Sequence, residues 1–152
     1  MSRAATEGYL LDTSVLSAFA PDRAAVSPEL GIWLRAASDR LFVPCIAVAE
    51  LEQGIAKLHR AGGVARAARL SIWLDELLKH YGDRVLPLDA AVSRVLGRMA
   101  DAAVASGQHP GFPDAAIAAL AKHHALLVLT RNTRHFDALG VANADPFVAL
   151  PD

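Results

Sequence analysis

The sequence predicts a three-layer α/β/α domain with a four- or five-stranded, mainly parallel sheet. Short, wholly apolar runs alternate with longer helical patterns along the 152 residues, and uninterrupted apolar runs are typical of strands that are buried on both faces. Hydrophobic residues make up 53% of the chain and charged residues 20%, which provides a core and argues against disorder. The length suits one domain, so we expect residues 1–152 to form a single domain.

Short apolar runs mark the expected strands. Asp12 ends the first run and Pro44 ends the second. The run at residues 126–130 is the most convincing strand, because it is apolar up to its final threonine. The expected strands are residues 8–11, 41–43, 84–88 and 126–130, with a fifth near Val141 or Phe147.

Capping residues and apolar periodicity mark the expected helices. Ser27, Pro28 and Glu29 have the order N-cap, proline at the first helical position and acidic first turn. Asp89 stands before a long apolar pattern that Gly107 is placed to end. The expected helices begin near residue 13 and close at Pro21, and then cover residues 28–38, 46–60, 64–81, 90–106 and 114–124.

Composition narrows the class of protein. Cys45 is the single cysteine, which excludes an intrachain disulfide and Cys-rich zinc sites. No apolar run approaches the ~20 residues of a membrane span, and the N-terminal MSRAATEG lacks the apolar region of a signal peptide. We therefore expect a cytoplasmic protein without a membrane partner. The net charge of −1 requires that any anionic partner be bound by a local patch or through a metal ion.

Polar residues follow the predicted strands at the edge where parallel sheets bind ligands. Asp12 ends the first strand, and Thr130, Arg131 and Asn132 end the strongest one. Asp12 could simply cap the following helix. Alternatively, one of the hydroxyls that follow Asp12 could cap the helix and leave the carboxylate free for other work.

Two further carboxylates stand on predicted helices. Glu50 shares a helix face with Gly54, and a glycine inside a helix costs about 1 kcal/mol relative to alanine, which suggests a close approach to the backbone at Gly54. Asp114 lies in the first turn of its helix, where a negative charge is favourable by itself. A solvated glutamate and a helix-stabilising aspartate are the structural alternatives. Three carboxylates at one edge would repel one another unless a cation joins them, and all-oxygen ligands favour Mg²⁺ or Mn²⁺.

Four segments of the chain resemble the signature segments of a known family. YLLDTSVLS, AVAELEQG, PDAAIAALAKHH and VLTRNTRHF resemble those of PIN-domain ribonucleases, closest to the VapC toxins of bacterial toxin–antitoxin pairs, including the FitB-like branch. The resemblance implies that Asp12, Glu50 and Asp114 hold a divalent metal. Asn132 stands where many members carry a fourth acidic residue, which puts a second metal in doubt. Thr13 and Thr130 match hydroxyl positions that orient the cluster or the phosphate.

The resemblance implies an endoribonuclease that depends on Mg²⁺, with Mn²⁺ as a substitute, and that its cognate antitoxin inhibits. The expected reaction is hydrolysis of an RNA phosphodiester by metal-activated water. Arg131 and Arg134 flank the expected site and suit phosphate by bidentate hydrogen bonding, whereas Arg66 and Arg69 are better explained as solvated helix surface. Family members form homodimers, so we expect one here.

Three other functions compete with the toxin. A PIN nuclease in RNA maturation would use the same site, and a degenerate PIN domain would bind RNA without cleaving it, an alternative that Asn132 supports. A response-regulator receiver needs an early acidic pair, but only Asp12 stands early in this chain.

Overall fold

The structure, a computed structural model, describes residues 6–152. Residues 1–5, which contribute to the expectation of a cytoplasmic chain, lie outside the described residues. A five-stranded parallel sheet in the order β3-β2-β1-β4-β5 forms the centre of the fold. The strands are β1 (Tyr9–Leu11), β2 (Leu41–Pro44), β3 (Val85–Leu86), β4 (Leu127–Leu129) and β5 (Asn143–Ala144). The predicted α/β class and parallel sheet are confirmed.

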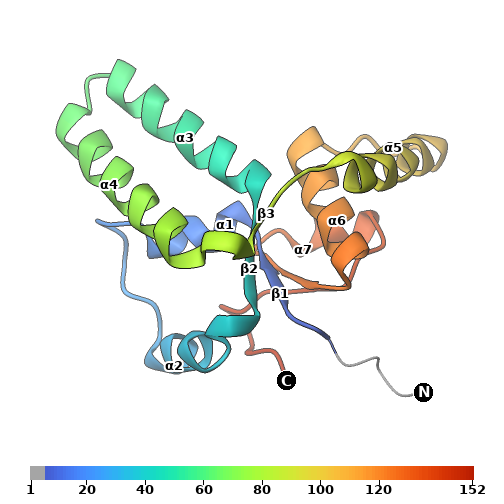
Figure 1. The fold of residues 1–152 in the computed structure, drawn as a ribbon, viewed down its shortest axis with the longest axis horizontal. Coiled ribbons are helices and arrows are strands. Elements are labelled where there is room, and N and C mark those ends of the chain that lie inside the picture. Colours follow the sequence, from blue (N-terminus) through green and yellow to red (C-terminus); the bar gives the residue numbers. More distant parts are fainter. Residues whose placement is uncertain (1–5) are drawn as a thin grey trace.

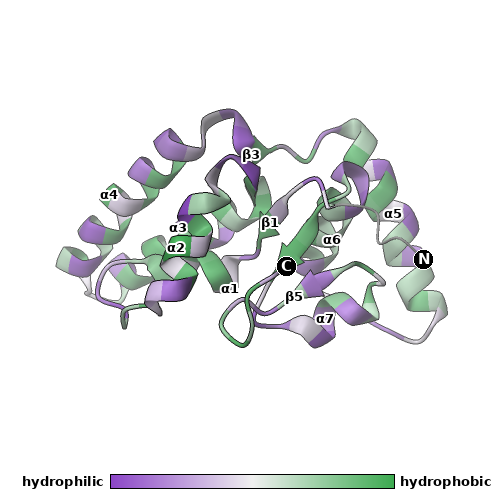
Figure 2. Cartoon of the chain, turned by 90° about the horizontal axis from the view of Figure 1, so that it is seen from below, coloured by the Kyte–Doolittle hydropathy of each residue, from purple (hydrophilic) through white to green (hydrophobic). Residues whose placement is uncertain are grey.

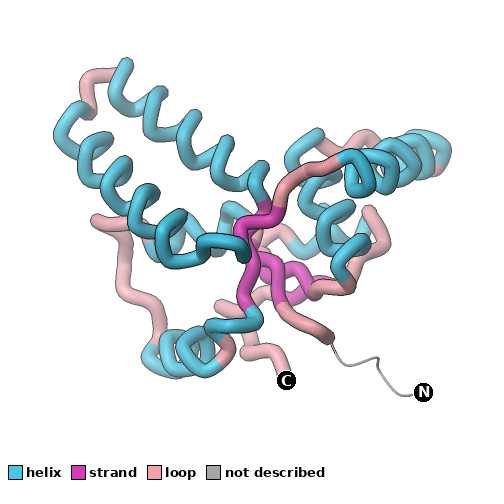
Figure 3. Tube along the Cα trace, in the orientation of Figure 1, coloured by secondary structure: helices cyan, strands magenta, loops and turns pink. Residues whose placement is uncertain are grey.

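The described residues contain seven α-helices, which cover both faces of the sheet. In Figure 1, α5 and α6 lie on one side of the sheet, whereas α2 and the α3–α4 hairpin lie on the other. Figure 3 shows the strands together between these two groups of helices. The helices are α1 (Thr13–Leu16), α2 (Pro28–Ala36), α3 (Cys45–Arg60), α4 (Val64–Tyr81), α5 (Ala90–Ala105), α6 (Phe112–His124) and α7 (Thr133–Ala138).

The central strand β1 sends side chains into two apolar cores. Leu10 packs with residues of α5 and α6, whereas Tyr9 and Leu11 pack with residues of α1 and α3, as the alternation of side chains along a strand requires. All three side chains are buried. Figure 2 shows that the central strands are mostly hydrophobic and that the outer helices carry both hydrophilic and hydrophobic residues. The wholly apolar strand pattern therefore has the predicted cause, which is burial on both faces.

Two predicted capping residues fix the starts of α2 and α5. Ser27 accepts a hydrogen bond from the backbone N–H of Leu30, and Asp89 accepts one from that of Val92. The two helices of the α3–α4 hairpin pack on each other around Ile55.

Several boundaries differ from the sequence prediction, most of them by one or two residues. α6 begins at Phe112 instead of residue 114, because Pro113 occupies its first turn, where a missing N–H is tolerated. β3 and β4 are shorter than predicted, and α1 ends at Leu16 in a short 3₁₀ turn, well before Pro21. α7 was not predicted, and the fifth strand lies at Asn143–Ala144, between the two positions considered.

The two tryptophans, Trp33 and Trp73, contribute to packing. Trp33 of α2 meets Tyr9 edge to face, with ring centroids 4.9 Å apart, and Trp73 of α4 packs against the core between α3 and α4. No helix among residues 6–152 has the length and apolar character needed to cross a membrane.

Candidate active site

The topology directs three candidate carboxylates to one edge of the sheet. Because β1, β2 and β4 are parallel neighbours, their carboxyl ends share an edge. Asp12 follows β1 directly, and Glu50 lies in the second turn of α3, which starts where β2 ends. α6 turns directly into β4, with Leu126 N–H bonded to the Ala121 carbonyl. The first turn of α6, which holds Asp114, therefore lies back at the edge where the strands end.

Asp12 is buried and held by three hydrogen-bond donors. Only 4% of its surface is exposed. Its Oδ1 accepts the backbone N–H of Thr13, and its Oδ2 accepts the hydroxyls of Ser14 and Thr130, each at 2.8 Å. Asp12 itself caps α1, so the idea that Thr13 or Ser14 replaces it as the cap is wrong. The two hydroxyls instead bind carboxylates, because their positions just after the cap turn them toward the edge.

Thr13 connects Asp12 to Glu50. The Thr13 hydroxyl donates to Glu50 Oε1 at 2.7 Å, while the Thr13 backbone N–H donates to Asp12. Thr13 therefore hydrogen-bonds to both carboxylates, one that follows β1 and one on α3.

The prediction for Gly54 is wrong. A Cβ built there has no heavy atom of the described chain within 4 Å, so the glycine makes no close approach within this fold. Gly54 lies on an exposed part of α3, where a side chain would meet solvent.

Asp114 pairs with a residue that the sequence interpretation did not assign. His135 Nδ1 lies 2.8 Å from Asp114 Oδ2, and the carboxylate accepts the hydrogen bond. Both residues line a cavity of about 350 Å³ beside the loop at residues 108–111, together with Arg134. The place of His135 shortly after the end of the strongest predicted strand, within VLTRNTRHF, was the signal that could have identified it.

Thr130 and the two residues that follow it make hydrogen bonds at the end of β4. Thr130 is fully buried, and its hydroxyl, besides donating to Asp12, accepts the backbone N–H of Asn132 at 2.9 Å. The side chain of Asn132 is exposed and makes no capping bond to the start of α7. The Arg131 backbone N–H donates to Ser14 Oγ at 3.1 Å, and the Arg131 guanidinium lies 3.9 Å from the centre of the Phe147 ring.

The other predicted cations lie on exposed surface. Arg66 and Arg69 of α4 are exposed, and Arg69 forms an ion pair with Asp22 at 3.0 Å. This ion pair is consistent with a surface role for Arg69. Arg134 is also exposed, beside Asp114 and His135.

The candidate ligands, the carboxylates of Asp12, Glu50 and Asp114, are of the type that a hard divalent cation prefers. Carboxylate oxygens are the preferred ligands of Mg²⁺, and the three donors on Asp12 leave part of its lone-pair capacity open. Within residues 6–152, however, no three acidic, histidine or cysteine side chains stand close enough together to hold a metal ion. Asp12 and Glu50 are joined through Thr13, whereas Asp114 is turned to His135. A metal shared by all three would require Asp114 to leave or share its contact with His135.

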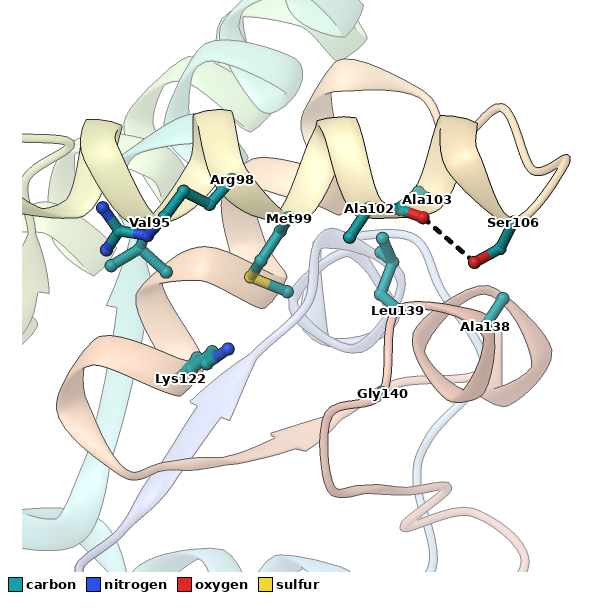
Figure 4. Close-up of a pocket in the computed structure, with 10 residues that line it drawn as sticks. All are labelled: Val95, Arg98, Met99, Ala102, Ala103, Ser106, Lys122, Ala138, Leu139 and Gly140. Atoms are coloured by element: carbon teal, nitrogen blue, oxygen red, sulfur yellow. Dashed lines mark hydrogen bonds between the residues drawn. The ribbon is translucent and has the colours of Figure 1, made fainter.

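A cavity of about 500 Å³ lies apart from these carboxylates, between α5, α6 and the end of α7. In Figure 4, Met99 and Leu139 face the space and Lys122 lies across from α5. No candidate residue of the active site lines it, so it adds nothing to the site.

Comparison with known proteins identifies the family. The PIN domain family matches residues 9–141. The chain is 34% identical to the VapC ribonuclease Y4jK of Sinorhizobium fredii, over 91% of this chain and 96% of that protein. It is 32% identical to the toxin FitB of Neisseria gonorrhoeae, over 91% and 97%, and 33% identical to the plasmid stability protein StbB of Pseudomonas syringae pv. tomato, over 92% and 99%.

Solved structures agree with this assignment. The crystal structure of FitAcB from Neisseria gonorrhoeae aligns with a TM-score of 0.76 at 32% identity, over 91% of this chain and 97% of that chain. FitAB bound to an IR36 DNA fragment aligns with a TM-score of 0.70 at 29% identity, over 91% and 95%. DNA-bound VapBC from Salmonella typhimurium shares the fold, with a TM-score of 0.77 at 20% identity, over 91% and 97%. The chain is therefore a member of the PIN domain family, of the VapC type and FitB-like.

Proposed function

We propose that this chain is the toxin of a VapBC-type toxin–antitoxin pair and acts as a metal-dependent endoribonuclease. The observation that carries the proposal is the Asp12 carboxylate, which is buried at the carboxyl edge of the sheet and fixed by three donors. A buried carboxylate in a fixed orientation is suited to hold a cation. The ribonuclease and toxin relatives support the same activity.

Asp12, Glu50 and Asp114 would hold Mg²⁺ or Mn²⁺, as their oxygen donors favour. When bound, such an ion supplies positive charge at the scissile phosphate and a nucleophilic water. The hydroxyls of Ser14 and Thr130 fix the orientation of Asp12, and the Thr13 hydroxyl fixes that of Glu50. Arg131 and Arg134, at the end of β4 and the start of α7, bind phosphates of the RNA by charge-assisted hydrogen bonds.

The antitoxin covers an apolar groove between α1, α2 and α4. The groove has a volume of about 530 Å³ and is lined by residues that include Phe19, Leu34, Trp73 and Leu77. The relative whose structure was solved as FitAB supports a protein partner for this chain. An amphipathic segment with apolar anchors at helical spacing fits such a groove. The proposal also includes a homodimer, which the molar mass in solution tests directly.

The non-cleaving alternative has two specific observations in its favour. Asn132 replaces an acidic residue of the family pattern. Asp114 is paired with His135, and among residues 6–152 no three acidic, histidine or cysteine side chains stand close enough to hold a metal ion. A PIN domain that lacks a working metal site would still bind RNA through its arginines. Metal-dependent cleavage distinguishes the two functions.

The test is cleavage of an end-labelled RNA pool by the purified chain in Mg²⁺, Mn²⁺ or EDTA, with Asp12→Asn in parallel. The proposal expects fragments in either metal, and none with EDTA or with the variant. Asp101→Asn, an exposed change on α5, is the matched control and should cleave like the wild type. Absence of cleavage by the folded wild-type chain in both metals would favour the non-cleaving domain.

A further inference from the structure

We propose that a second pocket, lined by Arg23, Arg131 and Phe147, binds the phosphate of a nucleotide next to the scissile bond. The proposal rests on the proposed nuclease function and names a part of the substrate-binding surface. The pocket has a volume of about 290 Å³ and lies between the loop at residues 23–27, the start of α2 and the segment after β5.

Two guanidinium groups line this pocket, and no carboxylate does. Within residues 6–152, neither Arg23 nor Arg131 has an ion pair, whereas the neighbouring Arg69 has one with Asp22. Two like charges at one pocket repel each other unless an anion joins them. The pocket is therefore suited to an anion that comes from outside the chain.

Arg131 is already held in position for such an anion. Its guanidinium lies 3.9 Å from the centre of the Phe147 ring, a cation–π contact that limits the freedom of the side chain. Its backbone N–H donates to Ser14 Oγ, and the same hydroxyl donates to Asp12 Oδ2. The Arg131 backbone is thus linked to the central carboxylate through Ser14, which ties one residue of the pocket to the proposed reaction centre.

The loop that carries Arg23 is tied down by its preceding residue. Asp22 adopts a left-handed backbone conformation with φ of 67°, and its Oδ2 accepts hydrogen bonds from Arg69 Nε at 3.2 Å and Nη2 at 3.0 Å. This contact joins the loop to α4. Arg23 therefore follows directly after the residue through which this loop contacts α4.

The apolar residues that line the rest of the pocket determine which anion fits it. Ala24, Val26, Leu30 and Phe147 give the pocket an apolar lining next to the two cations. The oxygens of a phosphodiester can accept hydrogen bonds from both guanidinium groups. The sugar and base attached to that phosphate can pack against the apolar residues. These contacts recognise the backbone of a single RNA strand without selecting a particular base.

The test measures the binding of a short, labelled, single-stranded RNA of mixed sequence in EDTA, by fluorescence anisotropy over a series of salt concentrations. Arg23→Gln and Arg131→Gln are each expected to weaken binding about tenfold, by the loss of a charge-assisted phosphate contact. Each should also reduce the slope of log affinity against log salt by about 0.7, the value for one phosphate contact on a single strand. Arg94→Gln, an exposed change on α5, is the matched control and should alter neither quantity.

A conservative variant distinguishes the loss of a phosphate contact from a folding defect. Arg131→Lys keeps the charge but loses the planar fork, so the salt slope should stay near the wild-type value while affinity falls. Wild-type affinity and slope in both glutamine variants would overturn the proposal, as would an equal loss in Arg94→Gln or no RNA binding by the wild type. A pocket that serves an acidic segment of a protein partner would leave RNA binding unchanged and would also overturn it. Because binding is measured without metal, the result is independent of whether the wild type cleaves RNA.

Discussion

The Thr130 hydroxyl donates a hydrogen bond of 2.8 Å to Asp12 Oδ2 and joins residues 118 positions apart in the chain. Both residues are buried, and each stands at the carboxyl end of a strand in the middle of the sheet. The contact therefore couples the pairing of β1 and β4 to the orientation of the central carboxylate. We therefore predict that stability and cleavage activity both depend on this hydrogen bond.

Thr130→Val removes this donor at nearly constant volume. We expect the free energy of unfolding to fall by about 1–3 kcal/mol, because a buried carboxylate loses a hydrogen bond. RNA cleavage should fall as well, because Asp12 loses one of the groups that fix it. Urea unfolding and a cleavage assay measure the two effects.

Thr130→Ser is the control for this change. It keeps the hydroxyl and deletes one methyl group, which costs about 1 kcal/mol of stability. Its cleavage should stay close to that of the wild type. Equal activity of the valine and serine variants would show that the hydroxyl does not orient Asp12.

His135→Ala should lower cleavage about 10- to 100-fold, the usual loss when a partner of a metal ligand is removed. The reason is the 2.8 Å contact between His135 Nδ1 and Asp114 Oδ2. Asparagine places its amide nitrogen close to the position of Nδ1, so His135→Asn should recover most of the activity. His135→Gln imitates the other ring nitrogen and should not. Similar activity in all three variants would exclude His135 as a positioning residue for Asp114.

Asn132→Asp restores the acidic residue that many family members carry. If the side chain of residue 132 faces the proposed cluster, the added charge should raise the affinity for Mn²⁺, which calorimetric titration measures. Ala91→Asp adds the same charge to an exposed position on α5 and serves as the control. An affinity for Mn²⁺ that stays unchanged or falls in Asn132→Asp would show that residue 132 does not act as a fourth ligand.

His124, at the end of α6, should make the fold less stable in mild acid. Burial lowers its pKa, the neighbouring His123 lowers it further, and Asp89 acts in the opposite direction. Since the pKa is lower in the folded chain than in the unfolded one, protonation favours unfolding. The contribution of His124 is fully present above the usual histidine pKa of about 6.5 and declines as pH falls below it.

His124→Gln removes this titration. The free energy of unfolding of the variant should vary less with pH than that of the wild type when both are measured between neutral and mildly acidic pH. Parallel pH profiles of the two proteins would rule out a contribution from His124. His123→Gln is a useful comparison, because it removes the charge that lowers the pKa of His124 but leaves the burial.

The parts of the fold with local signals could be predicted from the sequence. α4 was predicted at residues 64–81 and lies at Val64–Tyr81, because a long apolar period is followed by Gly82, whose φ is 52°. Ser27 and Asp89 cap their helices by contacts within three residues. These signals depend only on neighbouring residues.

The parts that depend on tertiary contacts could not be predicted. α7 has six residues and β5 has two, which is too short for a period to emerge from the sequence. The contact between Asp114 and His135 joins the first turns of α6 and α7, two helices that β4 separates in the sequence. Similarly, the sequence suggested a close approach at Gly54, but the fold leaves that position open.

Calorimetric titration of Mn²⁺ into the wild-type chain, Asp12→Asn, Glu50→Gln and Asp114→Asn tests whether the three carboxylates share one cation. If the three carboxylates share one cation, the wild type binds Mn²⁺ and each variant loses at least about tenfold in affinity. Asp101→Asn, on the exposed surface of α5, should bind like the wild type. Unchanged affinity in all three site variants, or no binding by the wild type, would show that these carboxylates do not form a metal site.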